Sequence, residues 1–235
     1  MTAANLPLPI VSATTLPIAG TAERFPVRRI YCVGRNYVEH IREMKEGDER
    51  DPPFFFQKPV DTIVEDGATV AYPADTQDFQ FEIELVVALG AGGRNISASC
   101  ALDVVYGYAV GLDMTRRDRQ REMREKMLPW ERGKSFDASA PCSAIKRVGD
   151  VGHPAKGAVT LDVNGTEKQR GDVAQMIWNV PEIIANLSQS YELAPGDIIM
   201  TGTPAGVGPV VPGDRLFGKV EGVGELSITI SACEA

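Results

Sequence analysis

Phe79-Gln80-Phe81-Glu82-Ile83-Glu84-Leu85-Val86-Val87 is the stretch that decides both the fold and the site, because it has the pattern of a β-strand with two carboxylates on one face. Successive side chains of a strand point to opposite faces, so Glu82 and Glu84 share one face and Ile83 lies on the other. Two carboxylates this close repel each other unless a cation lies between them. Oxygen ligands suit a hard divalent ion, Mg²⁺ first, with Mn²⁺ or Ca²⁺ as alternatives. A half-buried strand with a solvated outer face is the competing interpretation.

The composition is that of one domain with a sizeable apolar core. The chain has 235 residues, of which 43% are hydrophobic, and a formal net charge of −8. Chains of this length are often undivided when they are rich in strands. Binders of nucleic acids and membrane surfaces need a clustered basic face, so we expect neither partner. We find no secretory signal and no uninterrupted apolar run of about eighteen residues, which favours a cytoplasmic location.

The cysteines indicate neither a zinc site nor a disulfide framework. Cys32, Cys100, Cys142 and Cys233 are widely spaced and form no Cys-x-x-Cys pair. We expect them to be reduced thiols.

Residues 1–26 are rich in Pro, Ala and Thr and predict an N-terminal arm, followed by a single domain over residues 27–235. Apolar runs bounded by Gly and Pro predict strands over residues 27–34, 54–56, 80–89, 105–114, 159–163, 166–169, 198–201, 215–220 and 226–230. Helices are predicted from about Asn36, which can cap the first of them, and over residues 97–104, 115–126 and 177–191. Many short strands with few helices favour a mixed β-rich α+β fold, a rolled sheet or β-barrel-like domain.

A candidate general base lies on the first predicted helix. His40 and Glu43 are three residues apart, so both side chains lie on one helix face and the carboxylate can hold the imidazole. Such a histidine can take a proton from water near neutral pH. An incidental pair on a solvated surface is the alternative.

Asp113 ends another predicted strand and supplies a third candidate metal ligand. Arg117 and Gln120 follow on one helix face, where a planar cation and an amide can bind a substrate carboxylate. Lys134 is either a second cation near developing charge or a solvated loop lysine. The glycine-rich loop at residues 202–208, with Thr203, can present N–H groups to an anion but lacks the context of a nucleotide site.

Together these segments resemble the fumarylacetoacetate hydrolase family, in particular its small single-domain acylpyruvate hydrolases. The matching motifs run in order from residue 27 to the C-terminus: Tyr31-Cys32-Val33-Gly34-Arg35-Asn36-Tyr37, His40, Glu43, Phe56-Gln57-Lys58-Pro59, Glu82-Ile83-Glu84, Leu112-Asp113-Met114-Thr115, Arg117-Asp118, Gln120, Lys134-Ser135-Phe136-Asp137, Gly196-Asp197-Ile198-Ile199 and Thr201-Gly202-Thr203-Pro204.

The resemblance implies a rolled β-sheet fold, a homodimer and a role for each matched residue. Glu82, Glu84 and Asp113 would hold the metal; His40, Glu43 and Lys134 would be catalytic; Arg35, Arg117, Gln120 and Thr203 would surround the substrate. Several relatives carry His or Tyr before the first glutamate, where this chain has Phe81, so the surroundings of the metal can differ.

The expected substrate is a 2,4-diketo acid such as fumarylpyruvate. His40, oriented by Glu43, would activate a water for attack on the distal carbonyl, and cleavage of the C–C bond would release pyruvate as its enolate. The metal and Lys134 would stabilise that enolate.

Three alternatives stay open on the sequence. Decarboxylation of oxaloacetate, and isomerisation or decarboxylation of a hydroxymuconate-type dicarboxylate, pass through a similar enolate. A noncatalytic barrel that binds a small anion would need no pair such as His40 and Glu43. Residues 44–53 are charged and follow the first helix, so we expect them to form a lid.

Overall fold

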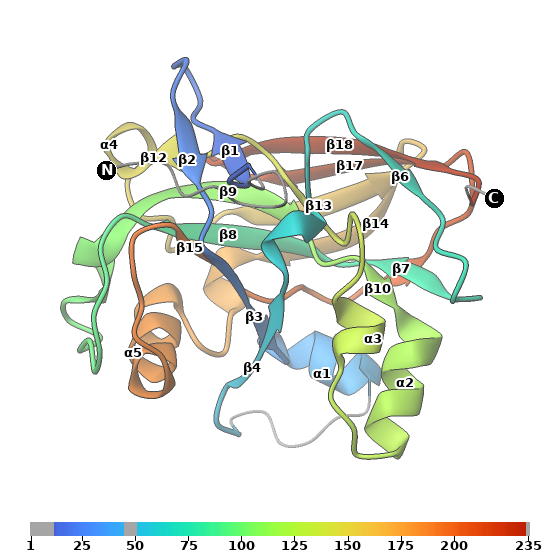
Figure 1. Cartoon of the computed structure of the whole chain (residues 1–235), viewed down its shortest axis with the longest axis horizontal. Helices are drawn as coiled ribbons and strands as arrows, with labels where there is room; N and C mark the ends of the chain where they lie inside the picture. The colour runs from blue at the N-terminus through green and yellow to red at the C-terminus, as the bar shows by residue number, and fades with distance from the viewer. Residues whose placement is uncertain (1–11, 45–50, 234–235) are drawn as a thin grey trace, which may run out of the picture.

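The computed structural model describes residues 12–44 and 51–233, and the strands within these ranges form four sheets (Figure 1). The largest sheet has the order β4 (Phe54–Lys58), β3 (Arg29–Gly34), β15 (Asp197–Met200), β8 (Ile83–Leu89), β9 (Val105–Leu112), β11 (Ala140–Cys142) and β5 (Ile63–Glu65), with β12 (Lys146–Arg147) also on β9. The second sheet has the order β14 (Thr166–Asp172), β13 (Ala158–Val163), β17 (Arg215–Val220), β18 (Gly224–Ser231) and β6 (Thr69–Ala71). Two small sheets comprise β10 (Thr115–Arg116), β7 (Phe79–Phe81) and β16 (Gly208–Pro209), and the hairpin of β1 (Thr15–Pro17) and β2 (Arg24–Pro26).

The main core lies between the two larger sheets. Ile83, Leu85 and Val87 of β8 belong to the same buried cluster as Leu161 of β13 and Leu226 of β18. The predicted β-rich architecture is therefore confirmed. The predicted hairpin is also present, because Asn164 and Gly165 join β13 to β14 with φ values of 53° and 76°, as a type I′ turn requires.

The opposite face of β8 is buried too, so the interpretation of a solvated outer face is wrong. Val86 and Ala88 lie in a second apolar cluster together with Leu16 of β1 and Phe25 of β2. The strand predicted over residues 80–89 is also divided at Glu82: β7 pairs with β10 and β16, whereas β8 pairs with β9 and β15. The glutamates therefore lie at a junction between two sheets.

The helices are α1 (Val38–Met44), α2 (Arg117–Glu125), α3 (Glu131–Lys134), α4 (Val148–Val151) and α5 (Val180–Ser190), with 3₁₀ turns η1 (Val60–Thr62), η2 (Ala101–Val104) and η3 (Val173–Gln175). The helices predicted over 115–126 and 177–191 are confirmed as α2 and α5. Asn179 caps α5, because its side-chain oxygen accepts the Glu182 N–H. The helix predicted over 97–104 is wrong, since only its last four residues form a 3₁₀ turn. In Figure 1, α1, α3 and α2 lie along one edge of the molecule.

The prediction that Asn36 caps α1 is wrong. Its side chain is fully buried and donates to the carbonyls of Trp178 and Thr201 at 3.0 and 2.7 Å, while its oxygen accepts the Trp178 N–H. The Asn36 side chain therefore links three loops and does not cap a helix. The division into an arm and a catalytic domain at residue 26 stays a prediction.

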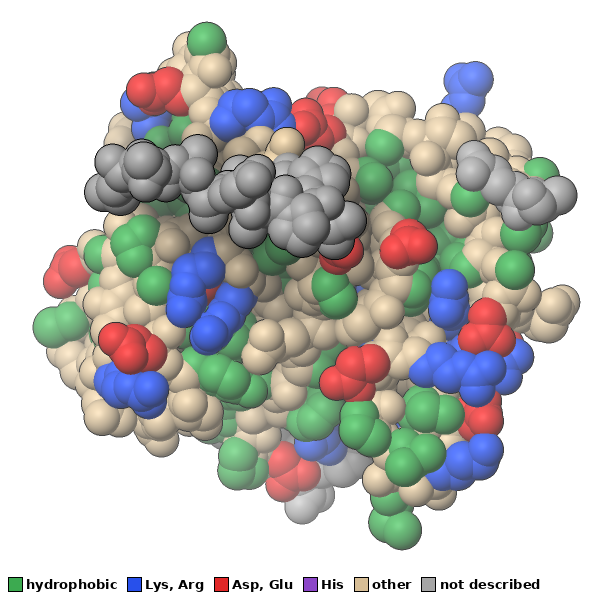
Figure 2. Space-filling view, in the orientation of Figure 1, with side chains coloured by type: hydrophobic (Ala, Val, Ile, Leu, Met, Phe, Trp, Pro, Cys, Tyr) green, Lys and Arg blue, Asp and Glu red, His purple; other side chains and the backbone are tan. Residues whose placement is uncertain are grey.

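On the face shown in Figure 2, Lys and Arg side chains lie among Asp and Glu rather than in one basic patch. Among the described residues, no helix is long and apolar enough to cross a membrane. Residues 45–50 of the predicted lid lie outside the described residues.

Candidate active site

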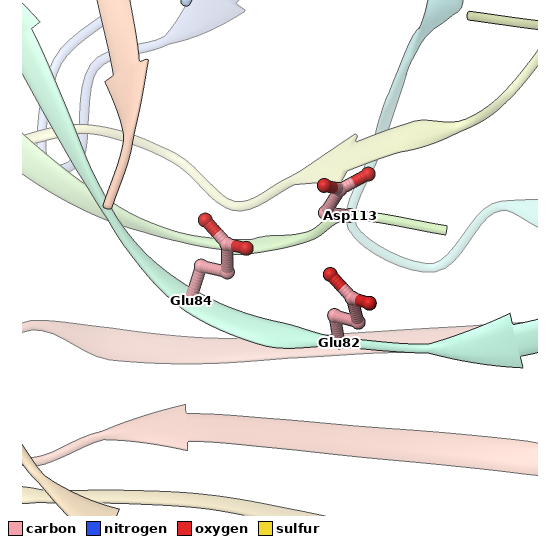
Figure 3. A group of neighbouring side chains, drawn as sticks. All are labelled: Glu82, Glu84 and Asp113. Carbon is pink, nitrogen blue, oxygen red and sulfur yellow. The ribbon is translucent and has the colours of Figure 1, made fainter. Parts of the chain in front are cut away.

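Three carboxylates on or beside neighbouring strands point toward one another (Figure 3). Glu82 lies between β7 and β8, Glu84 lies on β8, and Asp113 directly follows β9. The antiparallel register of β8 and β9 continues past Leu112, because Asp113 N–H donates to the Glu82 carbonyl at 2.9 Å. One oxygen from each carboxylate lies within 4.8 Å of the others, and none of the three residues is more than 4% exposed.

Two buried lysines contact this group. Lys134 Nζ donates to Glu82 at 2.8 Å, to Asp113 at 2.7 Å and to the Thr115 hydroxyl at 2.8 Å. The interpretation of Lys134 as a solvated loop lysine is therefore wrong. Lys58 Nζ lies 2.8 Å from the other oxygen of Asp113 and also donates to the Met114 carbonyl.

Arg117 is 1% exposed and provides the third cation. It pairs with Glu82 and donates to the side-chain oxygens of Gln80 and Gln120, at 2.8 and 2.5 Å. The predicted pair of Arg117 and Gln120 is thus in contact, but here the guanidinium orients a carboxylate of the protein.

Close backbone packing fixes both sides of the group. Gly202 N–H donates to Glu84 at 2.7 Å. Gly202 has a φ of +95°, and a Cβ at this position would lie only 2.7 Å from the Asn36 Cβ, so only glycine fits here. On α3, a Cβ on Gly133 would lie 2.7 Å from the Gln120 nitrogen, so α3 lies against α2 and carries Lys134 to the carboxylates.

The carboxylates differ in their tendency to ionise. Burial raises the pKa of Glu84 well above its usual range, and the charges of Asp113 and Glu82 raise it further. Burial also opposes ionisation of Glu82, but Lys134 and Arg117 outweigh it and hold the pKa of Glu82 well below its usual range. Burial lowers the pKa of Lys134, but the charges of Asp113 and Glu82 outweigh burial, so that pKa is raised and the lysine is a cation. Glu84 is therefore the carboxylate with the least positive charge around it.

His40 and Glu43 form the predicted pair, with Nδ1 3.2 Å from a carboxylate oxygen. Burial opposes ionisation of Glu43, but hydrogen bonds from His40 and the Gly206 amide outweigh it and lower the Glu43 pKa. An ionised carboxylate only accepts hydrogen bonds, so Nδ1 carries the proton and Nε2 of a neutral ring is free to accept one. The glycine-rich loop does present N–H groups to anions, but these anions are Glu43 and Glu84 of the chain itself.

One cavity brings these groups together. Nine of the ten predicted site residues line it, including Arg35, His40 and Thr203; Glu43 lies behind His40. Arg35 has a φ of 58°, a left-handed conformation that side-chain-bearing residues rarely adopt, and its side chain is 31% exposed. Thr203 is held by the Gln169 amide at 2.8 Å. The functions of these ten residues stay predictions.

Lys58, Gln80 and Thr115 contact predicted site residues but were not themselves predicted as site residues. Lys58 and Thr115 each lie within one of the family motifs of the sequence, and Lys58 also ends an apolar strand. Gln80, in the middle of β7, carries no such signal, because polar residues are common in strands.

The residues fit a divalent metal ion. All three candidate ligands are oxygen donors, as hard ions prefer. Asp113 Oδ1 is buried and, among the described residues, accepts no aligned hydrogen bond, although the Lys58 ammonium is near it. This oxygen and the Glu84 carboxylate are the groups that a cation would satisfy.

We expect Lys58→Met to destabilise the fold by about 3–5 kcal/mol, because the change leaves the buried Asp113 carboxylate without one of its two cations. Urea denaturation followed by circular dichroism measures this. Lys219→Met, which breaks the exposed pair with Glu225, is the control and should cost less than about 1 kcal/mol. Equal effects of the two changes would contradict a structural role for the buried pair.

Comparison with known proteins assigns most of the chain to one family. The family model described as fumarylacetoacetate (FAA) hydrolase C-terminal matches residues 29–231. The chain belongs to the fumarylacetoacetate hydrolase family. The resemblance seen in the sequence and the expectation of an enzyme of this family are thereby confirmed.

Relatives whose names give two different activities are similar to this chain. Fumarylpyruvate hydrolase of Ralstonia sp is 50% identical over 181 residues, which is 77% of this chain and 94% of the relative. The mitochondrial oxaloacetate tautomerase of Homo sapiens is 40% identical over 207 residues, 88% of this chain and 93% of the relative. The crystal structure of fumarylpyruvate hydrolase from Pseudomonas aeruginosa in complex with Mn²⁺ and pyruvate has a TM-score of 0.95 at 48% identity, and covers 97% of this chain and 100% of that chain.

Proposed function

We propose that this protein is a divalent-metal-dependent hydrolase that cleaves 2,4-diketo acids, with fumarylpyruvate as the first candidate, into a carboxylic acid and pyruvate. One observation carries the proposal: a buried group of three carboxylates faces the same cavity as a histidine held by a carboxylate. A noncatalytic protein that only binds a small anion would not need a general base beside a metal site. The relative that binds Mn²⁺ and pyruvate supports the same reaction class.

Glu82, Glu84 and Asp113 would hold the ion, and Mg²⁺ is the candidate that we favour. When bound, a divalent ion polarises a 2-oxo group and stabilises the negative charge of a pyruvate enolate.

The charges of the site favour an anionic substrate. Lys58, Lys134 and Arg117 already balance the three carboxylates, so a divalent ion leaves an excess of positive charge in the cavity. Arg35, at the partly exposed side of the cavity, adds to this excess. A dicarboxylate such as fumarylpyruvate brings compensating charge.

His40 acts as the base in this proposal. Glu43 fixes Nδ1–H, and Nε2 accepts a proton from the water that attacks the distal carbonyl. The C–C bond to the pyruvate carbon then breaks, and its electron pair forms the enolate, which is later protonated at that carbon. Lys134 is a cation fixed beside the carboxylates, where it stabilises developing negative charge.

A second candidate is the interconversion of the keto and enol forms of oxaloacetate. The relatives named as oxaloacetate tautomerases favour it. This reaction moves a proton at carbon and uses no attacking water. Decarboxylation of oxaloacetate and reactions of hydroxymuconate-type dicarboxylates remain the further alternatives.

The deciding experiment is a substrate panel assayed with Mg²⁺, with Mn²⁺ and with chelator. Fumarylpyruvate and acetylpyruvate should release pyruvate only when a metal is present, and oxaloacetate should be followed both for enol loss and for pyruvate release. Pyruvate release from the diketo acids that survives in chelator would contradict the metal-dependent hydrolase. Enol loss without any diketo-acid cleavage would favour the tautomerase.

We further propose that the protein is a homodimer, as the family resemblance implies. Light scattering coupled to size-exclusion chromatography checks this, and a monomer at assay concentrations would contradict it.

A further inference from the structure

We propose that Phe56 and Trp130 form a wall that sets the size of the acyl group that the active site takes. The wall separates two hollows of the surface, and Trp130 is the residue whose removal joins them. This inference rests on the proposed function and adds to it the residue that determines specificity.

The two aromatic residues belong to both hollows. The catalytic cavity, with a volume of about 30 Å³, is lined by Phe56 and Trp130 beside Lys134 and Arg35. A groove of about 610 Å³ lies on the other side and is lined by the same two residues together with Phe54, Pro129 and Tyr191. A volume of 30 Å³ holds little more than one or two waters, whereas the groove has room for a phenyl group.

The wall is a packed unit. The Trp130 ring lies 4.8 Å from the Phe54 ring and 5.9 Å from the Phe56 ring, measured between centroids and tilted by 59° and 54°. Aromatic pairs at these distances and angles attract each other beyond their apolar contact. The Phe54 and Phe56 rings, 6.1 Å apart, come from the same face of β4. The wall is therefore anchored on one strand, β4, and on the loop that carries Trp130.

The wall is also tied to the charged site. The Trp130 carbonyl accepts the N–H groups of Gly133 and Lys134, at 2.8 and 3.0 Å, so Trp130 begins the short helix that ends in Lys134. Lys134 Nζ lies 5.3 Å from the centre of the Phe56 ring. The ammonium beside the carboxylates therefore faces the inner side of the wall.

This arrangement determines where the acyl group of a substrate can lie. The 2-oxo acid end is drawn to the cationic centre at the carboxylates, so the acyl end extends away from it. Glu82, Glu84 and Asp113 are buried, while Trp130 and Phe56 are only partly buried. The acyl end consequently meets the wall, which accepts a short, flat chain and excludes a branched or aromatic group.

The test replaces Trp130 by Ala and compares acetylpyruvate with benzoylpyruvate. We expect the ratio of kcat/KM for benzoylpyruvate to that for acetylpyruvate to rise at least tenfold over wild type in Trp130→Ala. Trp130→Phe, which keeps a smaller ring, should give a smaller rise. Tyr191→Ala is the matched control, because Tyr191 lines the groove but not the cavity, and its ratio should stay within twofold of wild type. A ratio in Trp130→Ala within twofold of wild type, or an equal rise in Tyr191→Ala, overturns the proposal.

A binding measurement separates this inference from the proposed reaction. The Mn²⁺-loaded proteins are titrated by calorimetry with pyruvate and with 4-phenyl-2-oxobutanoate, which share a 2-oxo acid end and cannot be cleaved. Trp130→Ala and Trp130→Phe should improve the affinity for the phenyl compound relative to pyruvate, again by at least tenfold for Ala. If wild type cleaves no diketo acid, the proposed function fails. The affinity ratio then tests the wall by itself, and a ratio in Trp130→Ala equal to that of wild type overturns the inference about the wall. Thermal denaturation confirms that each variant is folded.

Discussion

Glu84→Gln is expected to reduce turnover by about a thousandfold or more while leaving the protein folded. Metal ions contribute several kcal/mol to the stabilisation of an enolate or oxyanion, and each 1.4 kcal/mol or so corresponds to about tenfold in rate. Glutamine keeps an oxygen that can accept the Gly202 N–H, which donates to Glu84 at 2.7 Å. It also replaces a buried carboxyl whose ionisation beside Glu82 and Asp113 is unfavourable, so the metal-free protein should be at least as stable as wild type.

Thermal denaturation with and without Mn²⁺ measures the loss of the metal site directly. At a metal concentration a hundredfold above Kd, binding stabilises wild type by about 2.7 kcal/mol, which is about 5–10 °C for a chain of this size. Glu84→Gln should lose this shift. Glu225→Gln, at an exposed ion pair, is the control and should keep both the shift and the activity. A variant at Glu84 that retains the metal-induced shift would show that the ion binds elsewhere.

Glu84 is a better position for this test than Glu82. Glu82 holds Arg117 and Lys134, so its removal would leave the buried Arg117 without its carboxylate and Lys134 with Asp113 alone, and would disturb the fold as well as the metal. In the described structure Glu84 has no comparable ion pair, and its side chain contacts a backbone amide instead.

His40→Ala is expected to lower kcat for acylpyruvate cleavage by about 10²–10⁴-fold, the usual contribution of a general base. In the described structure the His40 ring is held by Glu43 and not by the three carboxylates, so the metal-induced thermal shift should be unchanged. His153→Ala is the control: His153 is exposed and contacts the Tyr108 hydroxyl at 2.7 Å, outside the cavity.

The same variant separates the candidate reactions. Hydrolysis needs a base to activate water, whereas decarboxylation of oxaloacetate needs none. Near wild-type cleavage of acylpyruvates by folded, metal-loaded His40→Ala would refute the role of His40 as base.

The parts of the fold that the sequence predicted depend on local signals. Alternation along residues 81–85 places Glu82 and Glu84 on one face, and the spacing of His40 and Glu43 places them on one turn of α1. The Asn164-Gly165 turn specifies its own hairpin. Each of these features depends on residues close together in the chain, so pattern and propensity suffice.

The parts that failed depend on distant contacts. The face of β8 that carries Val86 is covered by a hairpin near residue 20, and nothing in the strand itself shows this. Asn36 has the pattern of a helix cap, but its partners include Trp178, 142 residues away. Lys58 was not predicted as a site residue, because the sequence around it does not indicate that it pairs with Asp113, which is distant in the chain.

The pairing of Glu82 and Asp113 with Lys58, Lys134 and Arg117 has a consequence for how the enzyme matures. A small zinc domain cannot fold until its ion arrives, because its ligands have no other partners. Here the chain supplies counter-ions from its own sequence, so a newly made polypeptide can reach its native state first and acquire the ion afterwards. Under the proposed function, the metal would then load and exchange reversibly on an already folded protein, according to the ions that the cell offers.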